Sequence, residues 1–483
     1  MMRYIFSKAL IIVSVVIIVG FALDNSSFAQ GGMGAPTKSS PATPAGGGSS
    51  PGIRKRNTNF KRRTVREAPQ PVETADSGPA ENTVTPGLEE KKQGLEAYNK
   101  EDYETAAAKL AEAGSHLPTD PEIFYPLGDS YSFKKDWTKA IEAYARALKF
   151  GEAKATADNY YYLGNAYEQT SKYVEAFAAY KKSDEKRPNN AETLTRLGDV
   201  ASNLSEWQAA INYYQRAFDI DPNISDADVF FNWAVAYVNG PKNHESAVRR
   251  FQRAIELNVD KVNEAYYLLA MSCKATGRNQ EAIDAFLKQL EKRNDDYFAW
   301  KAYFNVAELY FAQRDWQAAI RAEKGAVGID PKDGFSWDNL GTALNNVGSY
   351  AESAEAYRQA TLLMPNRPDW LLHLGRAYYR AEKHAEAIEA LSRAIDLQPN
   401  FPDAFYFRGI AHRSLGQYEQ AVSSLMKALE LGLSSKIQEA SARYNLAISY
   451  AKGGNVPAAR QQCDLLSTFG TNAPPDSFNV CRP

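Results

Sequence analysis

The chain has 483 residues, of which 44% are hydrophobic and 24% are charged, so it contains enough apolar side chains for a large folded body. Its 56 Lys and Arg against 58 Asp and Glu give a formal net charge of -2, which excludes the strongly basic balance of a general nucleic-acid binder. Three cysteines and five histidines are too few for a disulfide-dense scaffold or a Cys-rich metal site.

Residues 1–29 are predicted to be a signal peptide. Arg3 and Lys8 precede the apolar run 9–23, which is short for a bilayer span but typical of a signal-peptide core. The small residues Ser27 and Ala29 stand shortly before an expected cleavage site ahead of Gln30. We therefore expect export from the cytoplasm, to a bacterial periplasm; an uncleaved membrane anchor is the alternative.

Residues 30–86 are predicted to be a disordered linker, because they are rich in Gly, Ser, Thr, Pro and Ala and offer nothing to bury. Residues 1–86 carry 10 basic and 5 acidic side chains, net +5, which leaves net -7 for residues 87–483. Most of this positive charge lies in segment 54–66, for which a contact with an anionic envelope surface and a solvated spacer both stay open. The basic residues are Arg54, Lys55, Arg56, Lys61, Arg62, Arg63 and Arg66.

From residue 87 the chain repeats itself with a period near 34 residues, which predicts eleven copies of a helix–turn–helix unit. A small residue recurs in the first helix of each copy, at Gly94, Gly128, Gly164, Gly198, Ala234, Ala270, Ala307, Gly341, Gly375, Gly409 and Ala447. A second one follows in step in the second helix, at Ala106, Ala140, Ala176, Ala210, Ala247, Ala282, Ala319, Ser353, Ala387, Ala421 and Ala459. The two series predict an all-α array in which helix pairs stack on one another.

One clear copy reads Trp337, Leu340 and Gly341, followed by Tyr357 and Pro365. This resembles the tetratricopeptide repeat family, whose unit runs aromatic, Leu-Gly, Tyr, Ala, aromatic, Ala, Pro. The resemblance covers about residues 87–467 and implies an α-solenoid, a right-handed superhelix with an extended concave surface. Prolines stand where second helices are expected to end, since proline lacks an amide proton and disfavours a helical predecessor. They are Pro118, Pro188, Pro222, Pro331, Pro365 and Pro399.

Two copies depart from the pattern. The sixth has Asn279 in place of an aromatic residue and Gln289 in place of the later alanine, and it lacks a closing proline, so we expect it to pack loosely. The last has Ser467 in that alanine position and is expected to be a polar cap.

Residues 468–483 are predicted to be a tail without helical periodicity. In an exported protein Cys463 and Cys481 could form a disulfide that holds this tail, and both the bonded and the free states stay open. Cys273 occupies a position that is tyrosine in other copies and is expected to be a small buried residue.

No catalytic motif is found in the sequence. It contains no Gly-x-Ser-x-Gly elbow, no phosphate-binding glycine loop and no His-Glu-x-x-His pair. The acidic run 219–228 lacks the spacing of a calcium loop and reads as a helix end followed by an Asp cap. The five histidines are scattered along the repeats, at His116, His244, His373, His384 and His412. We therefore predict that the chain is not an enzyme and has no metal site and no cofactor.

The family resemblance implies that first helices line the concave groove, with one side chain of each pointing into it. An aromatic residue occupies this position in seven copies, at Tyr125, Tyr161, Phe231, Tyr267, Phe304, Tyr406 and Tyr444. An asparagine directly follows three of these rings, at Asn232, Asn305 and Asn445, and Asn339 occupies the equivalent position in the eighth copy. We interpret both sets as candidate partner-binding residues; the alternative is that the rings pack only against one another.

The sequence thus predicts a non-enzymatic protein–protein interaction scaffold of the cell envelope, which binds extended polypeptides in the concave groove. Two other functions stay open. The chain could bind a polysaccharide, or serve as an envelope-polymer assembly or secretion factor, or it could be an accessory subunit of a separately encoded enzyme. Its oligomeric state is also open.

Overall fold

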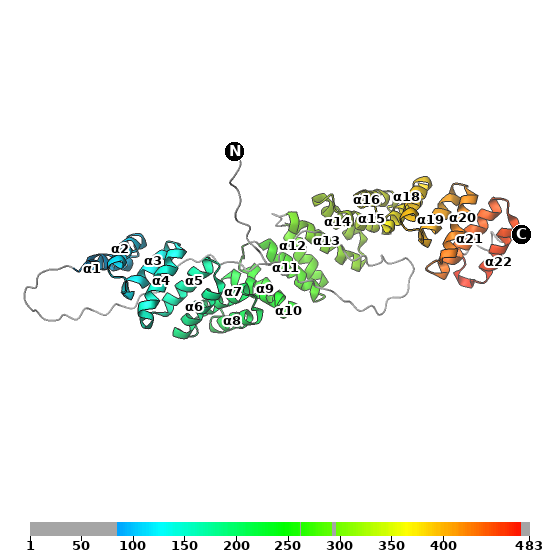
Figure 1. Cartoon of the computed structure of the whole chain (residues 1–483). Coiled ribbons are helices and arrows are strands. Elements are labelled where there is room, and N and C mark those ends of the chain that lie inside the picture. Colours follow the sequence, from blue (N-terminus) through cyan, green and yellow to red (C-terminus); the bar gives the residue numbers. More distant parts are fainter. Residues whose placement is uncertain (1–84, 261, 292–295, 475–483) are drawn as a thin grey trace, which may run out of the picture. The chain divides into compact units, whose positions relative to one another are not determined.

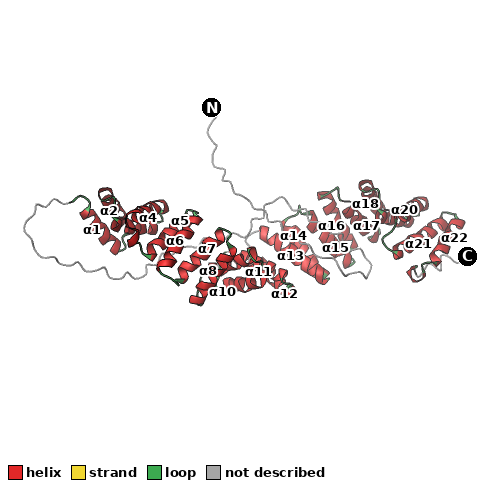
Figure 2. Cartoon of the chain, turned by 60° about the horizontal axis from the view of Figure 1, so that its bottom comes forward, coloured by secondary structure: helices red, strands yellow, loops and turns green. Residues whose placement is uncertain are grey.

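The computed structural model describes residues 85–260, 262–291 and 296–474. Within these ranges the chain forms 22 α-helices, two short 3-10 helices and no strands (Figures 1 and 2). The predicted signal peptide, nearly all of the predicted linker with its basic cluster, and the tail from residue 475 lie outside the described residues. The first described helix begins at Leu88, and the last α-helix ends at Ser467.

The 22 helices form eleven consecutive pairs, as the sequence predicted. The first helices are α1 (Leu88–Asn99), α3 (Pro121–Phe133), α5 (Ala157–Gln169), α7 (Ala191–Asn203), α9 (Ala227–Asn239), α11 (Val262–Ala275), α13 (Asp296–Gln313), α15 (Gly334–Asn346), α17 (Pro368–Arg380), α19 (Pro402–Ser414) and α21 (Lys436–Lys452). The second helices are α2 (Tyr103–His116), α4 (Trp137–Gly151), α6 (Tyr173–Lys186), α8 (Trp207–Ile220), α10 (His244–Glu256), α12 (Asn279–Glu291), α14 (Trp316–Ile329), α16 (Tyr350–Leu363), α18 (His384–Leu397), α20 (Tyr418–Leu431) and α22 (Val456–Ser467). The right-handed superhelical twist stays a prediction.

Local sequence signals set the ends of these helices. Side chains such as Asp102, Asp136 and Asp315 cap second helices by accepting a hydrogen bond from a backbone N–H in the first turn. All six predicted prolines stand two residues beyond the last residue of a second helix; for example, α8 ends at Ile220 and Pro222 follows. Asp226 caps α9 by accepting from the backbone N–H of Asp228, which agrees with the capping interpretation of that acidic run.

In every pair except the last, the first helix has a small residue where the second helix presents a large one, so that the two helices can cross closely. The large residue stands four positions after the small residue of the second helix, and we call this the facing position. It holds Leu110, Tyr144, Tyr180, Tyr214, Phe251, Phe286, Glu323, Tyr357, Leu391, Leu425 and Cys463. A Cβ atom on Gly198 would lie 2.6 Å from a ring carbon of Tyr214, so only glycine allows this approach.

Replacing Gly198 with alanine is therefore expected to destabilise the chain by about 1–3 kcal/mol, because the Tyr214 ring has no space to move away from the added methyl group. Gly328→Ala is the matched control, since nothing lies within 4 Å of its Cβ position, and its effect should stay below about 1 kcal/mol. Urea unfolding followed by circular dichroism measures both. Equal effects of the two substitutions would contradict this account of the crossing.

Neighbouring copies are joined through the first helices. Each second helix contacts the first helix of the next copy, and first helices also contact each other, as α1 contacts α3 and α17 contacts α19. The largest hydrophobic cluster runs from α7 to α14 and includes the fully buried Trp233, Phe231 and Phe251. Most neighbouring first helices therefore lie against each other, and all consecutive copies are joined through the second helix between them.

The two atypical copies keep this architecture. Gln289 of the sixth is buried, and its side-chain oxygen has no hydrogen-bond partner among the described residues. In the last, α22 buries only Ala459 and Leu466, and Ser467 is exposed, as expected of a polar cap. Cys273 is buried, as predicted, and it is a free cysteine. Cys463 takes part in a disulfide, but Cys481 lies outside the described residues, so the Cys463–Cys481 pairing stays a prediction.

Candidate functional site

The candidate site is the surface of the odd-numbered helices that carries the seven predicted aromatic residues, which we call the first-helix face. Three of these residues are buried, namely Tyr125, Phe231 and Tyr406. The other four are half-buried, namely Tyr161, Tyr267, Phe304 and Tyr444. None of the seven is exposed, so the rings contribute to the packing of the array as well as to its surface.

Three of the rings, those of Tyr161, Phe231 and Tyr267, pack against the facing position of their own copy. The Phe231 ring meets Phe251 edge to face at 5.7 Å, and Tyr267 meets Phe286 in the same way at 5.9 Å. The Tyr161 hydroxyl donates a hydrogen bond to Glu192 of the next first helix at 2.8 Å. The packing interpretation therefore holds for Phe231, which has no exposed surface, whereas the half-buried rings keep part of their surface for a ligand.

The predicted asparagines do not form a continuous row of amides on the surface. Asn232 is fully buried and donates to Asp199 Oδ1 at 3.0 Å. Asn305 and Asn445 donate to backbone carbonyls of their own helices, at 2.8 and 2.7 Å. Asn339 is half-buried and lies beside Glu323. The amide N–H groups of three of the four are therefore already used within the protein.

A buried charged cluster joins the third and fourth copies. The Arg196 guanidinium on α7 lies 3.8 Å from Glu168 on α5 and 3.9 Å from Asp199 on its own helix, and all three side chains are at most 5% exposed. The facing-position hydroxyls complete the cluster, because Tyr180 donates to Glu168 at 2.8 Å and Tyr214 donates to Asp199 at 2.7 Å. The cluster therefore holds two first helices and two second helices together.

A related contact links the first two copies. Asp129 on α3 is buried and accepts hydrogen bonds from the hydroxyls of Tyr144, at its own facing position, and Tyr98 on α1. Burial raises the pKa of Asp129 to about 6, although the two tyrosine donors act in the opposite direction. Above that pH the carboxylate is charged.

The sequence did not reveal the partners of Asp129 and Asp199. The available signal was a polar residue directly after the small glycine of the first helix, combined with tyrosine at the facing position of the same copy. Glu168 and Arg196 gave no such signal, because a charged residue on an amphipathic helix usually faces solvent.

The seventh copy has a carboxyl group where the other copies have a large apolar or aromatic facing residue, apart from Cys463 in the last. Glu323 is fully buried, and neither of its carboxyl oxygens has a hydrogen-bond partner of standard geometry within the described residues. Burial raises its pKa well above the usual range; Asp333 and Asp338 act in the same direction, against Ser336 and Asn339 beside it.

Replacing Glu323 with leucine, the facing residue of the ninth and tenth copies, is expected to stabilise the chain by about 1–3 kcal/mol, because it removes a buried polar group without a partner.

The stability of the native chain is also expected to depend on pH through Glu323. Its pKa is higher in the folded chain than in the unfolded chain, so the folded state is favoured while the carboxyl group is protonated. This contribution is full below the ordinary pKa of a carboxyl group and is lost as the pH rises through the folded-state pKa. Melting temperatures of the native chain and Glu323→Gln at several pH values measure this loss, which should disappear in the variant. The exposed Glu352→Gln is the control, and an unchanged pH profile in Glu323→Gln would contradict the assignment.

Charge changes sign along the first helices. In α3, α5, α7 and α9 there are seven acidic side chains and one basic side chain: Glu122, Asp129, Asp158, Glu168, Glu192, Asp199 and Asp228 against Arg196. In α17, α19 and α21 there are seven basic and three acidic side chains: Arg376, Arg380, Arg408, Arg413, Lys436, Arg443 and Lys452 against Asp369, Asp403 and Glu439. Some of the acidic residues of α3 to α9 lie in the first turn of their helix, where the helix dipole favours a negative charge. Asp129, Glu168 and Asp199 lie further along their helices.

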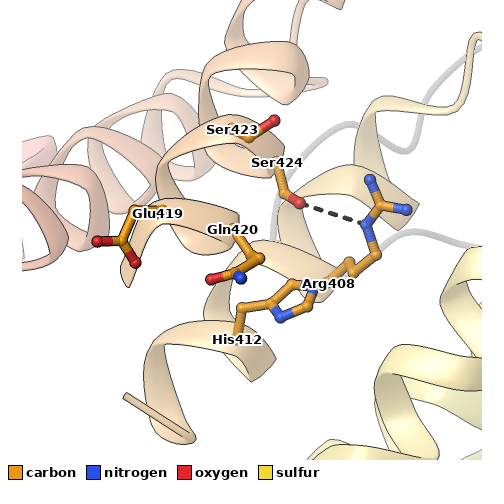
Figure 3. A pocket seen from close by; sticks show the side chains of 6 residues that line it. All are labelled: Arg408, His412, Glu419, Gln420, Ser423 and Ser424. Carbon is orange, nitrogen blue, oxygen red and sulfur yellow. Dashed lines mark hydrogen bonds between the residues drawn. The ribbon is translucent and has the colours of Figure 1, made fainter. Parts of the chain in front are cut away.

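A small polar pocket lies between α19 and α20 (Figure 3). Arg408 on α19 reaches across to Ser424 on α20, and its Nε donates to the serine Oγ at 3.2 Å. Nδ1 of His412, on the same side, is 2.6 Å from the side-chain oxygen of Gln417. Neither of these two hydrogen bonds joins a nucleophile to a base, so the pocket gives no support to a catalytic function.

In the described ranges, no group of three or more His, Cys, Asp or Glu side chains is arranged to hold a metal ion. Among the described helices, none combines the length and the apolar character needed to cross a membrane.

Eleven consecutive helix pairs, each stacked on the next, define a helical-repeat interaction scaffold. The family model described as "Tetratricopeptide repeat" matches residues 125–191, 242–297, 275–334, 339–405 and 406–474, and a second model with the same description matches residues 191–224. These matches cover more than half of the chain, which therefore belongs to the tetratricopeptide repeat family. Members of this family are protein–protein interaction scaffolds and are generally non-catalytic.

Curated relatives resemble parts of this chain. Tetratricopeptide repeat protein 8 of Caenorhabditis elegans is 25% identical over 43% of this chain and 40% of its own length. BBSome complex member BBS4 of Bos taurus is 24% identical over 57% of this chain and 49% of its own. The chain thus spans less than half the length of these curated relatives. A solved structure, the C-terminal part of a TPR repeat-containing protein from Cytophaga hutchinsonii, is 18% identical, covers 52% of this chain and 99% of its own, and has a TM-score of 0.42.

Proposed function

We propose that the chain is an exported scaffold of the cell envelope that binds an extended polypeptide on its first-helix face. The observation that carries this proposal is the set of half-buried rings at Tyr161, Tyr267, Phe304 and Tyr444. They recur on first helices of a scaffold family, and each offers apolar area at low conformational cost. A polar neighbour such as the half-buried Asn339 would set the register of the bound chain.

Photo-crosslinking in living cells tests the binding face. A photoreactive amino acid in place of Tyr267 is expected to capture a defined polypeptide, whereas the same probe at Val174, which is 68% exposed on the second helix α6, should not. A glycan adduct at Tyr267 would instead support the polysaccharide alternative. Adducts from Val174 in the absence of any from Tyr267 would overturn the proposed face.

Export is tested separately, since it rests on residues 1–29 of the sequence. N-terminal sequencing of the protein recovered from cell fractions should give a chain that begins at Gln30 in the periplasmic fraction. An intact N-terminus in the cytoplasmic fraction would contradict the envelope location and would leave the scaffold assignment untouched.

A further inference from the structure

The acidic stretch of first helices, α3 to α9, needs an explanation beyond the fold. Its mid-helix carboxylates Asp129, Glu168 and Asp199 are each at most 5% exposed, and the one basic side chain on these four helices is Arg196. The carboxylates also accept hydrogen bonds from neutral tyrosine and asparagine side chains. Burying like charges in one layer is costly unless cations or hydrogen bonds compensate them. We call α3, α5, α7 and α9 together the acidic half of the first-helix face.

A second observation in the same place also indicates a ligand. Asn165 on α5 directly follows the small Gly164, the position that holds Asp129 on α3 and Asp199 on α7. It is fully buried, yet both its side-chain oxygen and nitrogen have no hydrogen-bond partner among the described residues. Buried amides are nearly always bonded, so an unpartnered one between two buried carboxylates fits a site that receives a polar group from outside these helices.

The chain itself contains a segment of complementary charge. Residues 54–66 carry seven basic and no acidic side chains, and 18 residues, 67–84, connect them to the first described residue. Fully extended, 18 residues reach about 60 Å. Neighbouring helices lie about 10 Å apart, so α3 to α9 cover roughly 40 Å and are within this reach.

We propose that residues 54–66 bind, in an extended conformation, to the acidic half of the first-helix face of the same chain. The tether makes the contact intramolecular, with an effective concentration on the order of 1 mM, so individually weak ion pairs suffice. A partner polypeptide would then have to displace this segment to reach Tyr161, whereas Tyr267, Phe304 and Tyr444 lie on copies beyond it. This inference rests on one part of the proposed function, namely that the first-helix face binds polypeptides.

A crosslinker in segment 54–66 tests the contact in the full chain. With a photoreactive amino acid in place of Phe60, peptide mapping should find adducts on α3, α5, α7 and α9. Glu192→Gln combined with Asp228→Asn removes two carboxylates that are not fully buried, and should lower the adduct yield roughly tenfold. Glu142→Gln with Glu175→Gln, both exposed on second helices, changes the net charge equally and should leave the yield unchanged.

The same experiment distinguishes the other surfaces that segment 54–66 could bind. When isotopically labelled and unlabelled chains are mixed, adducts between labels would show that the segment binds a second copy and would overturn the intramolecular contact. Adducts on second helices, on α17 to α21, or on lipid alone would overturn it as well, the last in favour of the anionic-surface alternative. Because the Tyr267 probe reports partner binding independently, loss of one signal with retention of the other separates this inference from the proposed function.

Discussion

Replacing Trp233 with alanine is expected to destabilise the array by about 3–5 kcal/mol, as for a large aromatic side chain removed from a close-packed core. Trp233 on α9 is 1% exposed, and its ring lies about 6 Å from the rings of Tyr214, Phe218, Phe230 and Tyr237. The guanidinium of Arg250 also stacks over it at 4.3 Å. No other single side chain of the described residues joins so many aromatic contacts.

Two features make this experiment specific. Neighbouring copies have Leu197 and Leu269 in the same position, so Trp233→Leu should cost less than Trp233→Ala, because it leaves a smaller cavity. In a repeat array each copy contacts mainly its neighbours, so hydrogen exchange should quicken in α7 to α12 while α19 and α20 keep their protection. Equal losses for the two variants, or faster exchange throughout the array, would contradict this account of the core.

Replacing Arg196 with leucine is expected to cost about 3–5 kcal/mol, because it removes the cation that lies beside Glu168 and Asp199 and leaves their charges buried. The matched control is Arg216→Leu. Its guanidinium also lies 3.8 Å from a carboxylate, that of Asp184, but the arginine side chain is 49% exposed. An exposed pair contributes at most about 1 kcal/mol, so the control should be close to neutral.

Urea unfolding of the two variants, followed by the circular dichroism of the helices, measures this contrast. A restoring variant adds a further check: with Arg196→Leu present, Glu168→Gln removes one of the uncompensated charges and should regain part of the lost stability. Similar costs for Arg196→Leu and Arg216→Leu would mean that burial does not set the strength of the ion pair.

The predicted binding residues differ in exposure, and the sequence period does not predict this difference. Phe231 and Tyr267 occupy the same position of the repeat, yet the Phe231 ring is fully buried and the Tyr267 ring is half-buried. Their exposure depends on side chains of the neighbouring copies, and these vary from copy to copy. The same applies to Asn232, whose amide is bonded to Asp199 one copy earlier in the chain.

The sequence alone was sufficient to predict the eleven helix pairs, the small residues where the helices of a pair cross, the prolines after the second helices and the family. These features are local and periodic, so each copy reports them independently of the others. The packing of the helices was needed to show that Arg196, Glu168 and Asp199 meet across two copies. It also showed that Glu323 is buried in a position held by tyrosine, phenylalanine, leucine or cysteine in the other copies. The reason is physical: pairing and burial depend on which side chains of different helices meet when copies stack, and a repeat period fixes the backbone but not those contacts.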